Sequence, residues 1–327
     1  MNKSLATSGE EITGRPGLLG RVRWRSLAIV LPFLVIFIAV SIGSPSFLKP
    51  VNLLNILDQQ SSILIIAAAG TIVLITGGID LSVGATYALS SVVAGTLAMT
   101  QGPIVAILAG LAVGALVGLV NGVVSTILKI NALIATLAMS FIALGVASLV
   151  TGGNLIVLYD HPDFGVIAKA KILGVQSAIW IAIIVVVVLG LILARTTLGR
   201  YWYAAGGNAE AARLAGIQVS WVRILAFVLS GVAAGLGGIL DTSRVLSAQA
   251  SAGTALTFTV LAGIVVGGTS ILGGEGAIWR TVIGVLFIAL IGNGFNLLGV
   301  DALFQQITLG LILLIAVGID AWSRVRR

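Results

Sequence analysis

The chain has 327 residues, of which 58% are hydrophobic and only 9% charged, whereas about 25% are charged in an average soluble domain. This composition excludes a soluble protein, and the lack of cysteine with only one histidine excludes disulfides, thiolate catalysis and the common zinc sites. The formal net charge of +7 does not imply nucleic acid as a partner, because in a membrane protein the distribution of basic residues matters more than their sum.

The hydrophobic pattern predicts an all-α protein with about ten membrane spans, each of roughly 20 residues. Residues 1–26 are polar and basic and lack a small-residue cleavage site, so we expect a cytoplasmic arm rather than a signal peptide. Residues 27–323 would form one transmembrane domain, followed by a basic cytoplasmic tail at 324–327. The predicted spans cover residues 27–43, 53–75, about 85–99, 104–128, 132–150, 178–194, 224–240, 256–272, 282–298 and 303–321.

The basic residues give the expected orientation. With both termini in the cytoplasm, 14 of the 18 Lys and Arg residues fall in inner segments and 4 in outer ones. This split follows the positive-inside rule. Merging any two neighbouring spans into one would move all later segments to the opposite side of the membrane.

The first polar interruption is TGGIDLSVG, residues 76–84, which is either a loop or a break inside the membrane. Its two glycines end one helix, and Asp80 or Ser82 can cap the next. Asp80 has two possible roles. It is a hydrated helix cap on the cytoplasmic rim, or it is a functional carboxylate at membrane depth, where a charge is costly.

The fourth predicted span carries a glycine at every fourth position, namely Gly110, Gly114, Gly118 and Gly122. These glycines lie on one face of a helix, as in the small-residue motif that brings membrane helices close together. We therefore expect this face to contact another helix.

Residues 151–175 form a second polar segment, which the orientation places in the periplasm. Asp160, His161 and Asp163 lie close together there, but one histidine beside two exposed carboxylates is usually only solvated. No metal site is expected.

The longest polar segment is residues 195–223, at the cytoplasmic side. Gly206, Gly207 and Asn208 predict a turn, and Asn208 can cap a short helix over 208–215 with Glu210 in its first turn. Gly216 would end this helix. Trp202 and the tyrosines on either side are expected to anchor the loop at the lipid headgroups. The residues alone leave open an interfacial connector or a docking surface for a partner.

Several uncharged polar residues lie in or near the spans. Such groups suit a path for a neutral polyol, and they equally hydrogen-bond neighbouring helices. Asn293 and Asn296 are three residues apart and can share a helix face. The candidates for a substrate path or gate are Asp80, Ser82, Asn121, Asn131, Thr136, Asn293 and Asn296.

Four segments carry a family resemblance: TGGIDLSVG, GGNAEAARLAGI, GGTSILGGEGAIWRTVIG and GNGFNLLGV. Together they resemble the permeases of bacterial ABC importers for ribose, xylose, galactose and related sugars. The resemblance implies a type II importer fold in the bacterial inner membrane and a helix in the central loop that docks in a groove of the ATPase. The implied coupling residues are Gly206, Gly207, Asn208, Glu210, Ala211, Ala212, Arg213, Gly216 and Ile217.

The resemblance also implies partners. These are a second permease copy or close paralogue, a cytoplasmic ATP-binding cassette subunit and a periplasmic sugar-binding protein. The chain has no GxxxxGK[ST] phosphate loop, so it cannot supply its own ATPase. As a permease it is not expected to be an enzyme, and ATP with Mg²⁺ would bind to the partner subunit rather than to this chain.

This sequence departs from the family pattern at three places: residues 253–263 carry no charge, Glu275 replaces a common arginine, and residues 241–243 replace apolar ones. These departures leave the sugar open. Two rival functions remain, a branched-chain amino acid permease and, in a different class, a secondary carrier or channel that works alone.

Overall fold

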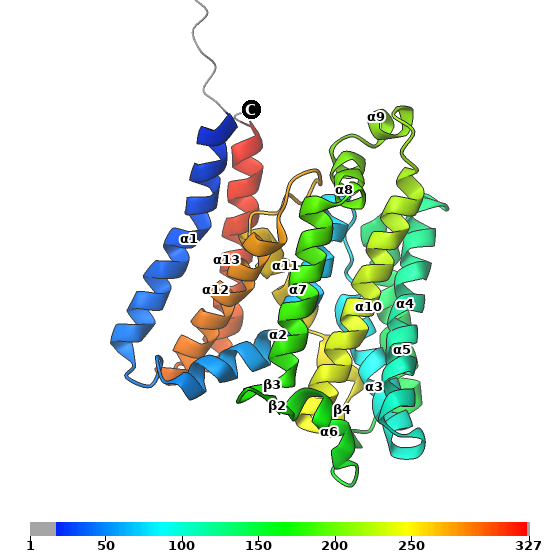
Figure 1. Cartoon of the computed structure of the whole chain (residues 1–327), viewed down its shortest axis with the longest axis vertical. Helices are drawn as coiled ribbons and strands as arrows, with labels where there is room; N and C mark the ends of the chain where they lie inside the picture. Colours follow the sequence, from blue (N-terminus) through cyan, green and yellow to red (C-terminus); the bar gives the residue numbers. More distant parts are fainter. Residues whose placement is uncertain (1–17, 326–327) are drawn as a thin grey trace, which may run out of the picture.

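The computed structural model describes residues 18–325, and these form an almost entirely helical bundle (Figure 1). The elements before the middle of the chain are α1 (Leu18–Gly43), α2 (Pro50–Ile75), α3 (Val83–Gln101), α4 (Pro103–Thr126), α5 (Ala132–Thr151), β1 (Ile156–Val157), α6 (Pro162–Lys169), β2 (Lys171–Ile172) and β3 (Val175–Gln176). Those that follow are α7 (Ser177–Arg195), α8 (Thr197–Gly207), α9 (Ala209–Leu214), α10 (Val219–Val245), β4 (Ser247–Ala248), the 3₁₀ turn η1 (Ala250–Gly253), α11 (Leu256–Val266), α12 (Ile278–Leu297) and α13 (Ala302–Val325).

The helical prediction is confirmed except for four strands of two residues each. β1 pairs antiparallel with β4, with Ile156 opposite Ala248, and β2 pairs with β3. These pairs fasten the segment between α5 and α7 at one end of the bundle. The larger part of the predicted arm, residues 1–17, and the last two residues of the predicted tail lie outside the described residues; α1 begins at Leu18.

Within residues 18–325, seven helices are long and apolar enough to cross a membrane, namely α2, α3, α4, α5, α7, α10 and α12. Three shorter apolar helical stretches accompany them at Val30–Gly43, Ala250–Val266 and Leu303–Ile315. Each predicted span overlaps one of these segments. The chain is therefore a multi-pass membrane protein, while the count of ten spans and their orientation remain predictions.

Helix α10 is the centre of the bundle and packs against α4, α3 and α2. The predicted glycine face of α4 makes the closest of these contacts. A side-chain carbon added at Gly114 would overlap the carbonyl of Gly231, and one added at Gly118 would overlap that of Phe227. The prediction that this face meets another helix is confirmed, and its partner is α10.

Two helix boundaries differ from the prediction. α10 covers 219–245 rather than 224–240, and in its C-terminal extension the charges of Asp241 and Arg244 neutralise each other at 2.5 Å. α11 ends at Val266 rather than near residue 272, since Gly268 has a φ of +76°, a left-handed conformation that ends a helix. The segment 267–277 is consequently a loop.

The bundle has two distinct ends. Figure 1 shows α8, α9 and the loop between α11 and α12 at one end, and α6 with the short strands at the other. The largest core cluster joins buried residues of α2, α7, α8 and α10. This core fixes α8 to the bundle, so α9 projects from a rigid support.

Candidate functional site

The short helix α9 has the cap that the sequence predicts. The side chain of Asn208 accepts a hydrogen bond of 2.9 Å from the backbone N–H of Ala211. Glu210 lies in the first turn and forms an ion pair of 2.6 Å with Arg213 on the exposed surface. Gly216 has a φ of +84°, which favours glycine after a helix end. The predicted helix and both of its ends are confirmed.

The residues before Asn208 form α8, a helix that is not among the elements predicted from the sequence. Gly206 and Gly207 are its last two residues, so the predicted turn at these glycines is wrong. The chain leaves the helix only at Asn208, whose backbone is extended. The missed signal is Thr196, whose side chain accepts a hydrogen bond of 3.2 Å from the N–H of Gly199 and so caps α8.

Trp202 is a core residue rather than a headgroup anchor. Its side chain is fully buried, and its Nε1 donates a hydrogen bond of 2.9 Å to the carbonyl of Val222, which fastens α8 to α10. Its neighbour Tyr203 donates from its hydroxyl to the carbonyl of Gly276 at 2.8 Å. Burial raises the pKa of the Tyr203 phenol, against the opposing charge of Arg280, and keeps it a neutral donor. The predicted anchoring role of Trp202 is wrong.

The predicted coupling residues divide by exposure. Gly206 and Ile217 are half-buried, and Ala212 packs into the core at 5% exposure. The exposed ones are Gly207, Asn208, Glu210, Ala211, Arg213 and Gly216. Leu214, which is not one of the coupling residues that the resemblance implies, is 83% exposed on α9. An isolated exposed leucine has no sequence signal of its own inside a helix-forming run.

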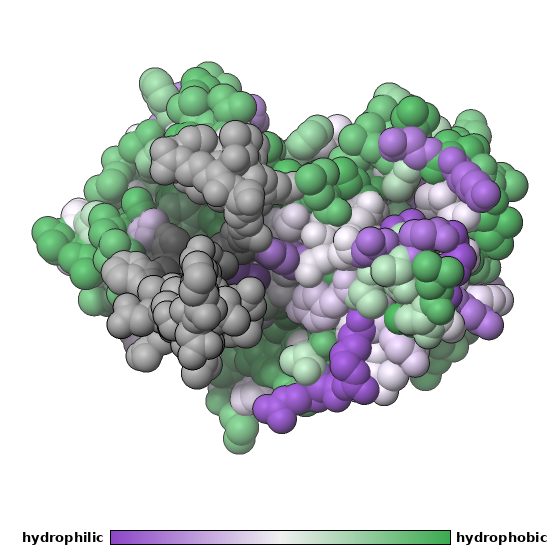
Figure 2. Space-filling view, turned by 90° about the horizontal axis from the view of Figure 1, so that it is seen from above, coloured by the Kyte–Doolittle hydropathy of each residue, from purple (hydrophilic) through white to green (hydrophobic). Residues whose placement is uncertain are grey.

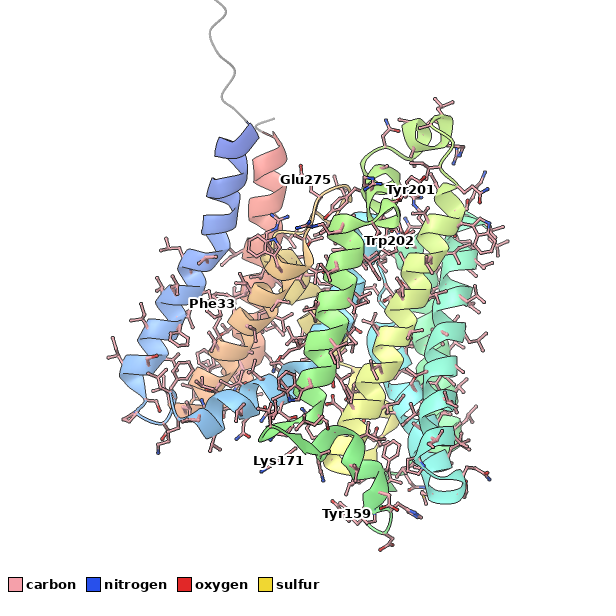
Figure 3. All side chains as sticks on the ribbon, viewed as in Figure 1. Phe33, Tyr159, Lys171, Tyr201, Trp202 and Glu275 are labelled. Atoms are coloured by element: carbon pink, nitrogen blue, oxygen red, sulfur yellow. The ribbon has the colours of Figure 1, made fainter. Side chains whose placement is uncertain are left out.

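This exposed surface lies at the end of the molecule seen in Figure 2. Hydrophilic side chains gather there over the half that carries α8 and α9, with hydrophobic ones between them. Figure 3 shows Tyr201 and Trp202 on α8, and Glu275 in the neighbouring loop, at the same end. A polar surface with apolar side chains such as Leu214 is suited to contact another protein.

Behind α8, glycines from three distant segments meet in a glycine junction, which consists of Gly77, Gly206, Gly207, Gly273 and Gly274. A side-chain carbon added at Gly273 would lie 2.9 Å from the Cα of Gly77, and one added at Gly274 would lie 2.9 Å from the Cα of Gly207. At Gly206 it would overlap the carbonyl oxygen of Ile75. Such close backbone approach requires glycine at positions 206, 273 and 274.

Hydrogen bonds reinforce this junction. The N–H of Gly274 donates to the carbonyl of Ile75 at 2.9 Å. Arg223 of α10 donates from Nε to the carbonyl of Thr76 at 3.1 Å and from Nη2 to the carbonyl of Ala205 at 3.2 Å. The end of α8, the segment after α2 and the loop before α12 are thus held as one unit. Each of them belongs to a segment that carries the family resemblance.

Asp80 is buried, with 5% exposure, in the segment 76–82 between α2 and α3. Its Oδ1 accepts hydrogen bonds from the backbone N–H of Ser82 at 3.0 Å and from the Ser82 hydroxyl at 2.6 Å. Its Oδ2 accepts from the hydroxyl of Ser230 on α10 at 2.8 Å. The interpretation of Asp80 as a hydrated cap is wrong in this respect, because the carboxylate is shielded from solvent.

Two other candidates belong to the surroundings of Asp80. Asn121 of α4 is buried and donates from Nδ2 to the hydroxyl of Ser82 at 2.7 Å. Thr136 of α5 is also buried and accepts from the N–H of Leu81 at 3.0 Å. The segment 76–82 is therefore a buried break that is hydrogen-bonded to α4, α5 and α10. Ser230 was missed because nothing distinguishes it from other small residues of α10.

The remaining candidates lie elsewhere. Asn131 caps α5, accepting from the N–H of Leu133 at 2.9 Å. Asn293 and Asn296 share a face of α12, as predicted, and both border one cavity. Each hydrogen-bonds a side chain on another helix, Asn52 and Gln305 respectively. These residues do not join the group around Asp80.

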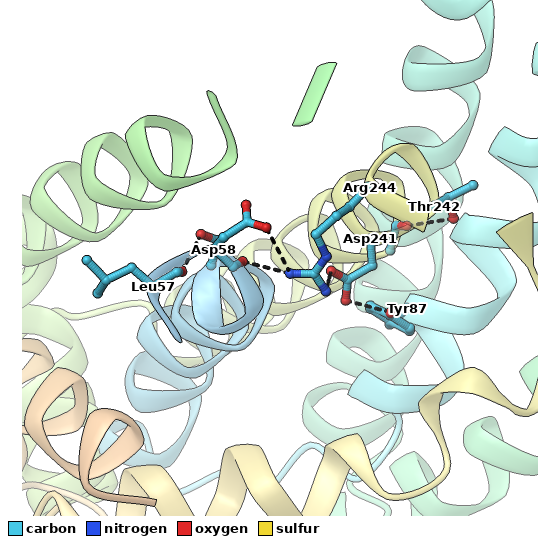
Figure 4. Close-up of polar contacts among 8 residues, drawn as sticks. Leu57, Asp58, Tyr87, Asp241, Thr242 and Arg244 are labelled. Atoms are coloured by element: carbon cyan, nitrogen blue, oxygen red, sulfur yellow. Dashed lines mark hydrogen bonds and ion pairs between the residues drawn. The ribbon is translucent and has the colours of Figure 1, made fainter. Parts of the chain in front are cut away.

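A charged network lies toward the other end of α10 (Figure 4). Arg244 forms an ion pair of 2.5 Å with Asp241, whose second oxygen accepts a hydrogen bond of 2.7 Å from the Tyr87 hydroxyl. Arg244 also donates to the backbone carbonyl of Asp58 at 2.7 Å. The network joins α2, α3 and α10, and Asp241 is one of the positions where this sequence departs from its family pattern.

His161 precedes α6 and lies outside these groups. Among the residues that the structure describes, no three His, Asp or Glu side chains lie together as a metal site would require.

The membrane-length helices, with a capped helix exposed at one end and a buried polar break behind it, make this chain a multi-pass membrane protein. The chain belongs to the family described as branched-chain amino acid transport system, permease component, whose model matches residues 52–317. The family is one of permeases, not of enzymes. The resemblance that the four sequence segments indicate is confirmed.

Three of the similar proteins are named as permeases for ribose or L-arabinose. The ribose import permease protein RbsC of Escherichia coli is 40% identical over 295 residues, covering 89% of this chain and 92% of that protein. RbsC of Bacillus subtilis is 42% identical over 294 residues, covering 88% and 91%. The L-arabinose transport system permease protein AraH of Escherichia coli is 36% identical over 322 residues, covering 98% of both chains. No solved structure matches the chain.

Proposed function

We propose that this chain is the membrane-spanning permease subunit of an ATP-binding cassette importer that translocates a monosaccharide or related polyol. The relatives named for ribose and arabinose import support the substrate class. A second copy or close paralogue would complete the path, and a periplasmic binding protein would deliver the sugar. The subunit would span the bacterial inner membrane about ten times, with both termini in the cytoplasm.

The observation that carries this proposal is the glycine junction behind an exposed coupling surface. The coupling surface consists of Gly207, Asn208, Glu210, Ala211, Arg213 and Leu214. All six are exposed, so a partner could reach them without unfolding the chain. A cytoplasmic ATPase subunit, which would hold the ATP and Mg²⁺, is the proposed partner.

The junction supplies a mechanical route from the ATPase to the membrane path. The carbonyls of Thr76 and Ala205 both bind the guanidinium of Arg223, so a displacement of α8 would act on the segment 76–82. That segment holds Asp80 and Ser82, which contact α10 and α4. We assign it to the inward gate, where Asp80 fixes the shape of the break. Closure of the ATPases on ATP would move α8 and α9 and so change access.

Gly207 offers a sharp test of docking, because a side chain added there meets nothing within 4 Å. Replacing Gly207 with leucine should leave the fold intact and block the ATPase contact. Gly190, on the membrane helix α7, has the same open space and provides the control. The measurement is co-purification of the ATPase with each variant, together with sugar uptake.

Co-purification and uptake should fall at least tenfold for Gly207→Leu and stay unchanged for Gly190→Leu. If uptake by Gly207→Leu survives with undiminished ATPase association, the coupling proposal is wrong. Uptake that continues without any ATPase would instead assign the chain to the stand-alone carriers.

A further inference from the structure

The end of the molecule opposite α9 holds a cavity of about 500 Å³ between α2, α12 and α13. Small-molecule sites typically have volumes of about 300–1,000 Å³, so this one is large enough for a ligand. Asn52 near the start of α2, Asn296 near the end of α12 and Gln305 near the start of α13 place it at that end of the bundle. Thr259 of α11 contributes a fourth side.

The lining has an unusual chemistry. Of its 19 residues, eight carry a side-chain amide, two carry a hydroxyl and the other nine are apolar. None of these 19 described residues is charged. An amide offers both donors and acceptors, as a sugar hydroxyl does, and the apolar residues can pack against the carbon skeleton of a sugar ring. An amino acid zwitterion would find no opposite charge in this lining.

The amide side chains on each helix lie along one face of that helix. On α2, Asn52, Asn55 and Gln59 recur at intervals of three and four residues, which places them on one face. On α12, Asn293 and Asn296 do the same. The helices thus present rows of hydrogen-bonding groups to a shared space.

Two pairs of these amides have a structural role. Asn52 and Asn293 exchange two hydrogen bonds, of 3.1 and 3.0 Å, and join α2 to α12. Gln305 donates to Asn296 at 2.7 Å and joins α13 to α12. These bonds hold the walls of the cavity in place.

The other four amides, Asn55, Gln59, Gln60 and Gln306, line the cavity without a hydrogen bond to any residue that the structure describes. Polar side chains inside membrane helices are costly, and they generally face a partner or a water-filled path. Contacts among the described helices do not involve these four amides, and because Asn55, Gln59 and Gln306 are exposed, they are accessible to a hydroxyl-rich ligand.

We infer that this amide-lined cavity binds the transported sugar as a neutral polyol. The inference rests on the proposed function, because it takes the ligand to be the importer's substrate. Asn55, Gln59 and Gln60 supply hydrogen bonds to the sugar hydroxyls, and Asn52 with Asn293 positions the helices that carry them.

A direct test uses the natural absence of cysteine. Gln59→Cys is labelled with a membrane-impermeant maleimide in purified permease, with D-ribose, L-arabinose or L-leucine added at high millimolar concentration. Gln101→Cys, an exposed amide position on α3 outside the cavity, is the control. One of the sugars should slow labelling at position 59 several-fold and leave position 101 unaffected. Equal labelling with and without either sugar, or protection by leucine instead, overturns the inference.

Uptake supplies the second measurement. Gln59→Leu and Asn55→Leu keep the side-chain size but remove the hydrogen bonds, and Gln101→Leu is the matched control. Uptake per assembled complex should fall about tenfold for each cavity variant, as expected for the loss of one or two hydrogen bonds, and not for the control. Wild-type uptake by both cavity variants contradicts the inference.

The two proposals can fail separately. If the unsubstituted chain imports no sugar while a sugar still protects position 59, the cavity is a sugar site and the proposed import function is wrong. If the unsubstituted chain imports sugar but position 59 is unprotected and both leucine variants transport normally, the import function stands and the cavity inference is wrong.

Discussion

The guanidinium of Arg223 donates a hydrogen bond of 3.1 Å to the carbonyl of Thr76, 147 residues earlier in the chain. The same guanidinium binds the carbonyl of Ala205 at 3.2 Å. One side chain of α10 therefore fixes the end of α2 to the end of α8. In the proposed importer this is the point where movement of the ATPase would reach the membrane path.

Gly206 should tolerate no side chain, whereas Gly207 should tolerate one. A methyl group at Gly206 would overlap the carbonyl of Ile75, and overpacking of this kind costs about 1–3 kcal/mol. Gly206→Ala is therefore expected to lower the melting temperature in detergent, and Gly207→Ala to leave it unchanged. Equal melting temperatures for the two variants would show that the junction is looser than described.

Asp80 should be replaceable by asparagine but not by leucine. Its three hydrogen bonds come from neutral donors, and an asparagine oxygen can accept those of Ser82. Leucine would leave the buried hydroxyls of Ser82 and Ser230 without this acceptor, at about 1–3 kcal/mol for each unsatisfied group. Uptake and thermal stability should thus survive in Asp80→Asn and fall in Asp80→Leu. Loss of uptake in a stable Asp80→Asn would assign the charge itself a role in transport.

Breaking the charged network should destabilise the protein. Arg244→Leu leaves Asp241 with no basic partner. Removing one partner of a buried pair costs about 3–5 kcal/mol, and because these side chains are 22% and 17% exposed, the expected loss is below about 3 kcal/mol. Replacing Asp241 as well should recover part of this loss. Thermal unfolding of the two single variants and the double variant gives the coupling energy. If the stability lost in the double variant equals the sum of the losses in the two single variants, Arg244 and Asp241 do not stabilise each other.

The orientation can be read by thiol labelling in this cysteine-free chain. Ala211 on α9 and Tyr159 at the other end are both exposed, Tyr159 by 70%. In intact cells, an impermeant reagent should label Tyr159→Cys and spare Ala211→Cys until the membrane is opened. The reverse pattern would place α9 outside and exclude ATPase docking there.

The sequence predicts the parts of this fold that depend on local chemistry. The span positions follow from hydrophobic length, and the α9 helix follows from the cap at Asn208 and the glycine at 216. The contact between α4 and another helix follows from glycine spacing. In each case the signal lies within a few residues of the feature it predicts.

The features that the sequence does not predict depend on contacts between distant residues. Trp202 resembles an interfacial aromatic until Val222 is seen to accept its N–H. Asp80 resembles a hydrated cap until Ser230, 150 residues away, is seen to shield it. The glycine junction cannot be predicted from the sequence for the same reason. Its three segments each carry a family motif, but they meet only in the folded chain.

The most direct test of the coupling account is the ratio of sugar uptake to ATP hydrolysis in Arg223→Leu, measured in the reconstituted importer beside the wild type. Arg223 lies behind α8 rather than among the six residues of the coupling surface, so the ATPase should still bind and hydrolyse ATP. Uptake per ATP should fall at least tenfold, with association and hydrolysis retained. A wild-type ratio in a folded Arg223→Leu permease would contradict the coupling account.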